Sequence, residues 1–173
     1  MSVSLYEATV PSFAQIIEAM AGVLKKGEAH AIEKGMAPDD WVGARLFSDM
    51  APLIFQVRQA AHHSVGAIEA TKKGVFSPDL TPPPDTFADL KATVDSALAT
   101  LAAYRPEEVN ELVGRDMRFQ LGERIMPFTA ENFLLSFSLP NFYFHATTAY
   151  DILRHNGVPL GKRDYMGRPR LKM

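Results

Sequence analysis

The hydrophobic residues of this chain recur at intervals of three and four over several long stretches, which is the spacing of an amphipathic helix. The first stretch begins at Pro11, whose fixed φ suits a first helical turn, and runs through Ile32 to Gly35, a suitable C-cap. Asp40 is then expected to cap a short turn through Trp41. The apolar stripe of the first helix contains Phe13, Ile16, Ile17, Met20, Val23 and Leu24.

A second long helix is predicted from Ser48 to Lys73, with Gly74 as its terminator. At 100° per residue, His62 and His63 each lie roughly 130° from the centre of its apolar stripe, so both are expected at the surface or at an interface. Asp49, Gln56 and His63 follow one another at intervals of seven and share one flank. The stripe itself contains Leu46, Met50, Leu53, Ile54, Val57, Ala61 and Ile68.

The rest of the chain divides into a loop, a third helix, an ambiguous segment and a last helix. Residues 76–87, which include three consecutive prolines, are expected to form a loop before a helix from Thr86 to Tyr104. Residues 107–128 have no clear pattern, although 118–128, RFQLGERIMPF, could form a hairpin that turns at Gly122 and Glu123. Thr129 can cap the following helix, in which Pro140 marks either a kink or the first turn of a new helix, and Asn156-Gly157 ends it.

One histidine of the last helix is expected to face the interior. His145 lies within about 60° of the centre of the face formed by Phe142, Ala149 and Ile152, and Asn141 stands one turn before it. Long amphipathic helices with short connections predict an antiparallel four-helix bundle, in which sites are built from side chains on facing helices. His145 is then either a core histidine hydrogen-bonded to a neighbour or one ligand of a metal site that would need further ligands.

The amino-acid composition excludes several kinds of functional site. The chain has 173 residues, 47% of them hydrophobic and 22% charged, which indicates one globular domain spanning residues 1–173. Because it contains no cysteine, disulfides, thiolate metal sites and a cysteine nucleophile are excluded. The sequence also lacks a Gly-rich phosphate loop, a serine elbow and a pair of carboxylates on one helix face.

Charge is unevenly distributed around the net value of −2. After Leu153 there are six Lys and Arg residues against Asp164 alone, a net +5, whereas the remainder has 12 basic and 19 acidic residues, a net −7. The basic tail, residues 156–173, could lie on its own domain or on a second subunit. Aromatic residues do not interleave its basic ones, so nucleic acid is not expected as a partner.

The sequence also bears on where the protein acts. The N-terminus lacks the basic and apolar regions of a secretory signal, so a cytoplasmic location is expected. The longest apolar window, residues 133–149, is interrupted by Pro140, Asn141 and His145 and falls short of the ~20 apolar residues of a membrane span. No membrane partner is therefore expected.

Two blocks of the sequence carry a family resemblance. The segment LPNFYFHATTAYDILRHNGVPLGKRDYMG, residues 139–167, closely resembles the C-terminal signature of an uncharacterised bacterial family, a domain of unknown function in the DinB/YfiT-like superfamily. Residues 45–57, RLFSDMAPLIFQV, also resemble that family. The resemblance implies a DinB-like antiparallel four-helix bundle, with a short irregular or hairpin segment before the last helix, and a homodimer as the assembly.

The resemblance also implies a site that this sequence only partly retains. In metal-bearing relatives, a histidine of the second helix and two histidines four apart on the last helix hold a divalent ion such as nickel or zinc. Here His145 matches the second of the pair, but Asn141 stands in place of the first. Asp49 or Gln56 is the best-placed third group on the second helix.

Two functions follow as hypotheses. The first is a homodimeric helical protein with a degenerate metal site that binds a small ligand or has a structural role, with no cofactor, its pocket formed by Asn141, His145, Asp49 and Gln56. The alternative is a divalent-metal-dependent enzyme of the thiol-transferase or isomerase type, in which His145, Asn141 and Asp49 would hold nickel or zinc.

Overall fold

The computed structural model describes residues 3–81 and 85–172, so the three prolines of the expected loop, at 82–84, lie outside the described residues. Its first helix, α1, spans Leu5–Glu33 and starts six residues before the predicted position. The sequence prediction was wrong here because Ser4 and Glu7 form a capping box, with Ser4 Oγ accepting from the Glu7 amide at 3.2 Å. Pro11 therefore lies inside the helix.

The second long helix begins later than predicted and is not uniformly α-helical. It consists of α2 (Leu53–Ala61), a π-helical segment η2 (His62–Gly66) and α3 (Ala67–Lys73), and Gly74 ends it in the left-handed conformation with φ 78°. Pro52 precedes the first turn, where its ring is tolerated. The residues before it form turns, and a short 3-10 helix, η1 (Pro38–Trp41), begins without a side-chain cap, so Asp40 is not the predicted cap.

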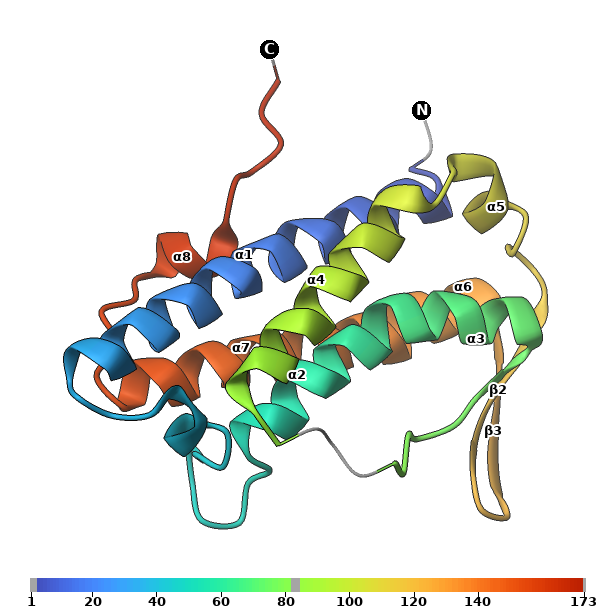
Figure 1. The fold of residues 1–173 in the computed structure, drawn as a ribbon. Helices are drawn as coiled ribbons and strands as arrows, with labels where there is room; N and C mark the ends of the chain where they lie inside the picture. The colour runs from blue at the N-terminus through green and yellow to red at the C-terminus, as the bar shows by residue number, and fades with distance from the viewer. Residues whose placement is uncertain (1–2, 82–84, 173) are drawn as a thin grey trace.

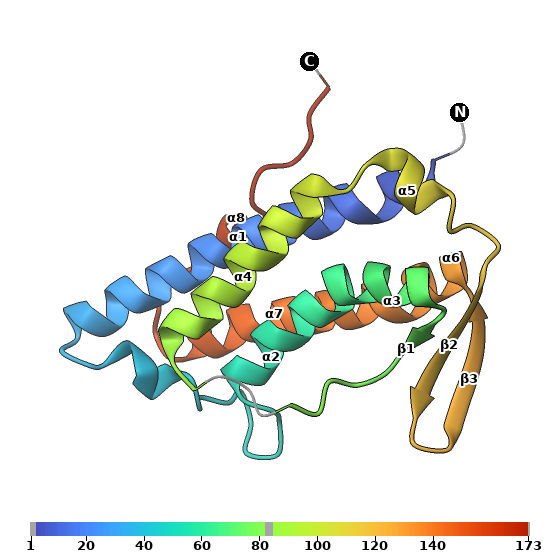
Figure 2. The ribbon, with the colours of Figure 1, turned by 45° about the vertical axis from the view of Figure 1, so that its right-hand side comes forward.

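The third helix and the possible hairpin are confirmed, whereas the short helix at the start of the ambiguous segment was not predicted. Helix α4 spans Phe87–Ala103, and a short helix α5 (Pro106–Asn110) follows. Strands β2 (Asp116–Leu121) and β3 (Arg124–Thr129) pair antiparallel around a turn at Gly122 and Glu123, and β1 (Val75–Phe76) pairs parallel with β2. The hairpin extends beyond the end of the helices (Figure 2).

The last long helix also contains a π-helical segment. Thr129 caps α6 (Ala130–Asn132), which continues into η3 (Phe133–Ser138) and α7 (Leu139–His155). Pro140, which has no N–H to donate to the preceding turn, comes directly after the π-helical segment, where the normal i to i−4 ladder is already interrupted. Pro140 thus sits in the first turn of α7, and the predicted helix end at Asn156-Gly157 is confirmed.

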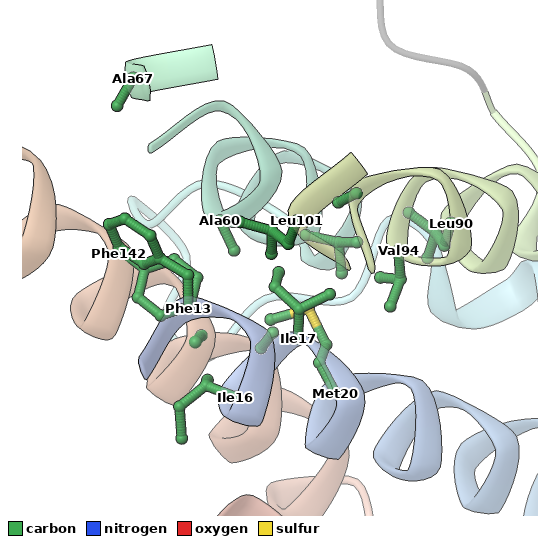
Figure 3. Packing of buried hydrophobic residues seen from close by; sticks show 14 of the residues in the cluster. Phe13, Ile16, Ile17, Met20, Ala60, Ala67, Leu90, Val94, Leu101 and Phe142 are labelled. Atoms are coloured by element: carbon green, nitrogen blue, oxygen red, sulfur yellow. The ribbon is translucent and has the colours of Figure 1, made fainter. Parts of the chain in front are cut away.

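Four long helical units surround one hydrophobic core. Figure 1 shows α1 beside α4, and α2–α3 beside α7, which gives a four-helix bundle with a small sheet before the last helix. In Figure 3, side chains of α1 meet those of α2, α4 and α7, and the rings of Phe13 and Phe142 pack edge to face with centroids 4.8 Å apart. Both rings are fully buried. This core fixes α2 and α7 as neighbours.

The first part of the basic tail lies on its own domain. Its helix α8 (Lys162–Met166) packs against α1 (Figure 1). Lys26 pairs with Asp164 at 2.7 Å, and Gln15 Nε2 donates to the Met166 carbonyl at 2.8 Å. The sequence allowed the tail to lie on its own domain or on a second subunit. In the structure, this segment lies on its own domain. Within the described ranges, no helix combines the length and hydropathy needed to cross a membrane.

A candidate ligand site at a pair of histidines

Two histidine rings lie face to face between the second and last long helices. His63 of η2 and His145 of α7 have ring centroids 5.8 Å apart and planes only 17° from parallel. His63 is 6% exposed, so the prediction that it lies at the surface was wrong. A uniform 100° step does not describe the π-helical turn, and β1 and η3 cover the side of the helix that a simple bundle would leave open.

Ser138 fixes the proton position on His63. The Ser138 hydroxyl donates to the main-chain carbonyl of His63 at 2.9 Å, and the same oxygen lies 3.2 Å from His63 Nδ1. Because the single hydroxyl hydrogen is used by the carbonyl, Ser138 Oγ must accept from Nδ1–H. The imidazole of His63 therefore carries its proton on Nδ1 and presents an acceptor lone pair at Nε2.

Gln56 does the same for His145. The Gln56 amide nitrogen donates to the Ala51 carbonyl at 2.9 Å, which places the amide oxygen 2.7 Å from His145 Nδ1. A carbonyl oxygen can only accept, so His145 also carries its proton on Nδ1. Gln56 itself is 2% exposed, and its orientation is thus set inside the protein. Both rings consequently present Nε2 as an acceptor.

Burial keeps both rings neutral. Removal from water, followed by repulsion from His145 and His62, lowers the pKa of His63 from 6.5 to about 3. Burial alone lowers the pKa of His145 to about 4. At neutral pH, both side chains are uncharged imidazoles that can accept a hydrogen bond or donate a lone pair to a cation.

Aromatic rings surround the pair. The His63 ring lies 5.1 Å from Phe76 and 5.9 Å from Phe137, while His145 lies 5.9 Å from Phe55 and 5.4 Å from Phe144, centroid to centroid. His145 and Phe55 are partly exposed, and Phe144 is 57% exposed. The site therefore reaches the surface on the α7 side, with an apolar rim around two polar atoms.

The sequence-predicted site residues are only partly brought together. Gln56 and His145 are in direct contact, as described, but Asn141 turns to its own helix and donates to the Phe137 carbonyl at 2.7 Å. Asp49 lies exposed in a turn before α2 and is not on the second helix, contrary to the prediction. His63 and Ser138 were missed as site residues. The interval of seven between Gln56 and His63 was the one available signal.

The donor set does not match a three-ligand metal centre. Two neutral imidazoles are present, but within residues 3–81 and 85–172 no three His, Cys, Asp or Glu side chains come close enough to hold an ion. Catalytic zinc sites ordinarily have three protein ligands. By the family resemblance, a further histidine would be expected on the last helix, but Asn141 occupies that position.

Comparison with known proteins identifies a matching family and a similar solved structure. The sequence profile of a domain of unknown function, DUF1993, matches residues 5–166. The fold is similar to the crystal structure of a DinB family member protein from Shewanella denitrificans, with a TM-score of 0.80 and 29% identity, over 98% of this chain and 95% of the other. No curated protein matches the chain significantly.

Proposed function

We propose that this chain, which belongs to the DUF1993 family of domains of unknown function, binds a small ligand at the His63–His145 pair, a degenerate form of the metal site expected from the DinB resemblance. The observation that carries the proposal is that each ring donates its Nδ1–H, to Ser138 Oγ and to Gln56 Oε1 respectively, which leaves both Nε2 atoms as acceptors. These bonds satisfy the buried imidazole N–H groups, and they also fix both tautomers with Nε2 as the acceptor.

The chemistry of the pair selects the ligand. Two neutral imidazoles with free Nε2 lone pairs accept hydrogen bonds, so the ligand must donate them. An anion would find no positive charge there, because the pKa values of about 3 and about 4 keep both rings uncharged at pH 7. The phenylalanine rim favours a ligand with an aromatic or other apolar body and a cationic or neutral donor group.

A matched pair of probes tests this proposal. Benzamidine donates hydrogen bonds and is cationic, whereas benzoate has the same shape, accepts and is anionic. We expect benzamidine to shift the side-chain 15N resonances of His63 and His145 in a saturable manner, and benzoate to leave them unchanged. His155→Ala, at the exposed end of α7, is the control variant and should retain binding.

The opposite preference, or no response to benzamidine at either ring, would remove the proposal. His145→Ala should abolish the response while retaining the fold. Circular dichroism and the NMR spectrum of the variant distinguish loss of binding from unfolding. His145 is the better position for this test, since it is more exposed than His63.

The alternative, a divalent-metal-dependent enzyme of the thiol-transferase or isomerase type, is favoured by one observation. Ligating histidines usually donate their second N–H to a protein acceptor, as both rings do here. Elemental analysis of protein purified without chelator decides between the two. One equivalent of nickel or zinc that is lost in His145→Ala would establish the metal site in place of the ligand site.

The exposed face of α7 supports self-association into a homodimer. Pro140, Tyr143 and Phe144 recur there at i, i+3 and i+4, and all three are exposed. A second copy of the chain would cover these apolar groups, including Phe144 at the rim of the histidine site, so dimer formation and ligand entry would use the same face of α7. Light scattering coupled to gel filtration should give twice the monomer mass, and Phe144→Ser should weaken the dimer. A protein that remains monomeric at all concentrations would contradict the proposed homodimer.

A further inference from the structure

A groove of about 530 Å³ runs between α4 and the α2–η2 segment, and the histidine pair does not line it. One wall contains Arg58, His62 and Val65, and the other contains residues of successive turns of α4, among them Asp89, Thr93 and Thr100. From Asp89 to Thr100 the groove follows α4 for ~16 Å, at 1.5 Å per residue. Its dimensions suit an elongated molecule.

Several hydrogen-bond donors of this groove are already used within the protein. Thr93 and Thr100 donate their hydroxyls to the carbonyls one turn earlier, those of Asp89 and Ser96, each at 2.9 Å. His62 Nε2 lies 3.1 Å from the Ser77 carbonyl and must carry the proton. The hydroxyl oxygens and His62 Nδ1 therefore remain as acceptors.

Two carboxylates, those of Asp79 and Asp89, line the groove. Asp79 Oδ1 accepts from both the amide and the hydroxyl of Thr81, at 3.0 and 2.7 Å, and these bonds lower the pKa of Asp79. Asp89 Oδ2 accepts from the Thr86 hydroxyl. One oxygen of each carboxylate is thus used for local structure, and the other is left for a further donor. Both groups line the groove.

The positive charge of Arg58 only partly balances the negative charge of the two carboxylates. Its Nη1 and Nη2 donate to the main-chain carbonyls of Thr81 and Asp79, so the guanidinium is bound to the backbone. Its Nε is buried, away from any ligand in the groove. One cation and two carboxylates give the groove a net charge of −1, with an excess of acceptors over donors.

We infer that this groove binds a linear aliphatic polyamine, with an ammonium group at Asp79 and Asp89 and its methylene chain along Val65 and the alanines of α4. Each ammonium has only donors, which matches a wall that has mainly acceptors. The site is separate from the proposed histidine site and does not depend on it.

Calorimetry with 1,6-diaminohexane and the neutral isostere 1,6-hexanediol tests the inference. The diamine should bind with one-to-one stoichiometry and at least tenfold more tightly than the diol. Binding should weaken as salt is raised, because the contacts are partly exposed. Asp89→Asn should weaken the diamine roughly fivefold, as for a partly exposed ion pair. Asp95→Asn, on the same helix outside this groove, should have no effect.

A steric variant keeps the test independent of charge and of the hydrogen bond between Thr86 and Asp89 at the start of α4. Ser96 is exposed and lines the groove, so Ser96→Leu should block diamine binding without disturbing the fold. Ala99→Leu, exposed on the same helix and outside the groove, is its control. Equal binding of diamine and diol, equal loss in the two Asp variants, or full binding by Ser96→Leu would each overturn the inference.

Discussion

The Ser138 hydroxyl contacts His63 twice, at the main-chain carbonyl at 2.9 Å and at the ring Nδ1 at 3.2 Å. Each of the two residues belongs to a π-helical segment, η3 and η2, and the contact joins segments 75 residues apart. Short π-helical segments inside α-helices occur often at functional sites. Here both of them contribute to one site, and Ser138 links them.

Ser138→Ala is expected to lower stability and to release the tautomer of His63. The change leaves a buried N–H and a buried carbonyl without their partner, at a cost of about 1–3 kcal/mol in the free energy of unfolding. Urea denaturation measures the cost, and 15N NMR of the imidazole measures the tautomer. Ser136→Ala, an exposed serine of the same π-helical segment, should change neither.

Stability is expected to decrease as the pH falls from 6.5 toward 4. The native pKa values of His63 and His145, about 3 and about 4, lie below the ordinary 6.5, so over this interval the unfolded chain binds protons that the native protein does not. The contribution of the two neutral histidines to the free energy of unfolding is fully present above pH 6.5. The steepest loss, for two protons, is about 2.7 kcal/mol per pH unit.

Denaturation midpoints at pH 7.5, 6.0 and 5.0 measure this dependence before the carboxylates begin to titrate. The His155→Ala variant, which removes an exposed histidine, should show the same dependence as the original chain. A stability that stays constant between pH 7.5 and 5.0 would mean that the two rings are not held in a neutral form.

Asn141→His is expected to create a metal site. It restores two imidazoles four residues apart on α7, and His63 would supply a third from the facing helix. Nickel or zinc at a hundredfold excess over Kd should then stabilise the variant by about 2.7 kcal/mol, visible as a rise in Tm. The unmodified chain should show no such rise. A variant that also fails to respond would indicate that the Nε2 atoms do not converge.

Gln56→Glu is expected to raise the pKa of His145. The new carboxylate would lie where the amide oxygen now stands, 2.7 Å from Nδ1, and a negative charge at that distance favours the imidazolium. An NMR titration should find the pKa well above about 4. Gln120→Glu, on the hairpin, is the charge control. An unchanged titration would show that Gln56 does not contact the ring.

The helical periodicity was sufficient to predict the bundle, including the face of α7 that carries His145. Those predictions succeeded because an apolar stripe of a helix has few ways to be buried. The start of α1 was missed because the Ser4–Glu7 capping box lies before Pro11, a residue that itself suits a first helical turn. The start of α2 was missed because the turn residues before it continue the apolar pattern.

The sequence by itself determined a helical bundle and the family. It allowed a hairpin before the last helix, and it offered Asp49 or Gln56 as the second-helix partner of an inward-facing His145. Only the tertiary structure decided that His63 is its partner, because a π-helical turn changes the direction of side chains in a way that no fixed angle per residue describes. It also decided the two tautomers, since Ser138 lies 75 residues from His63 and Gln56 lies 89 residues from His145. Hydrogen-bond partners distant in sequence leave no periodic signal.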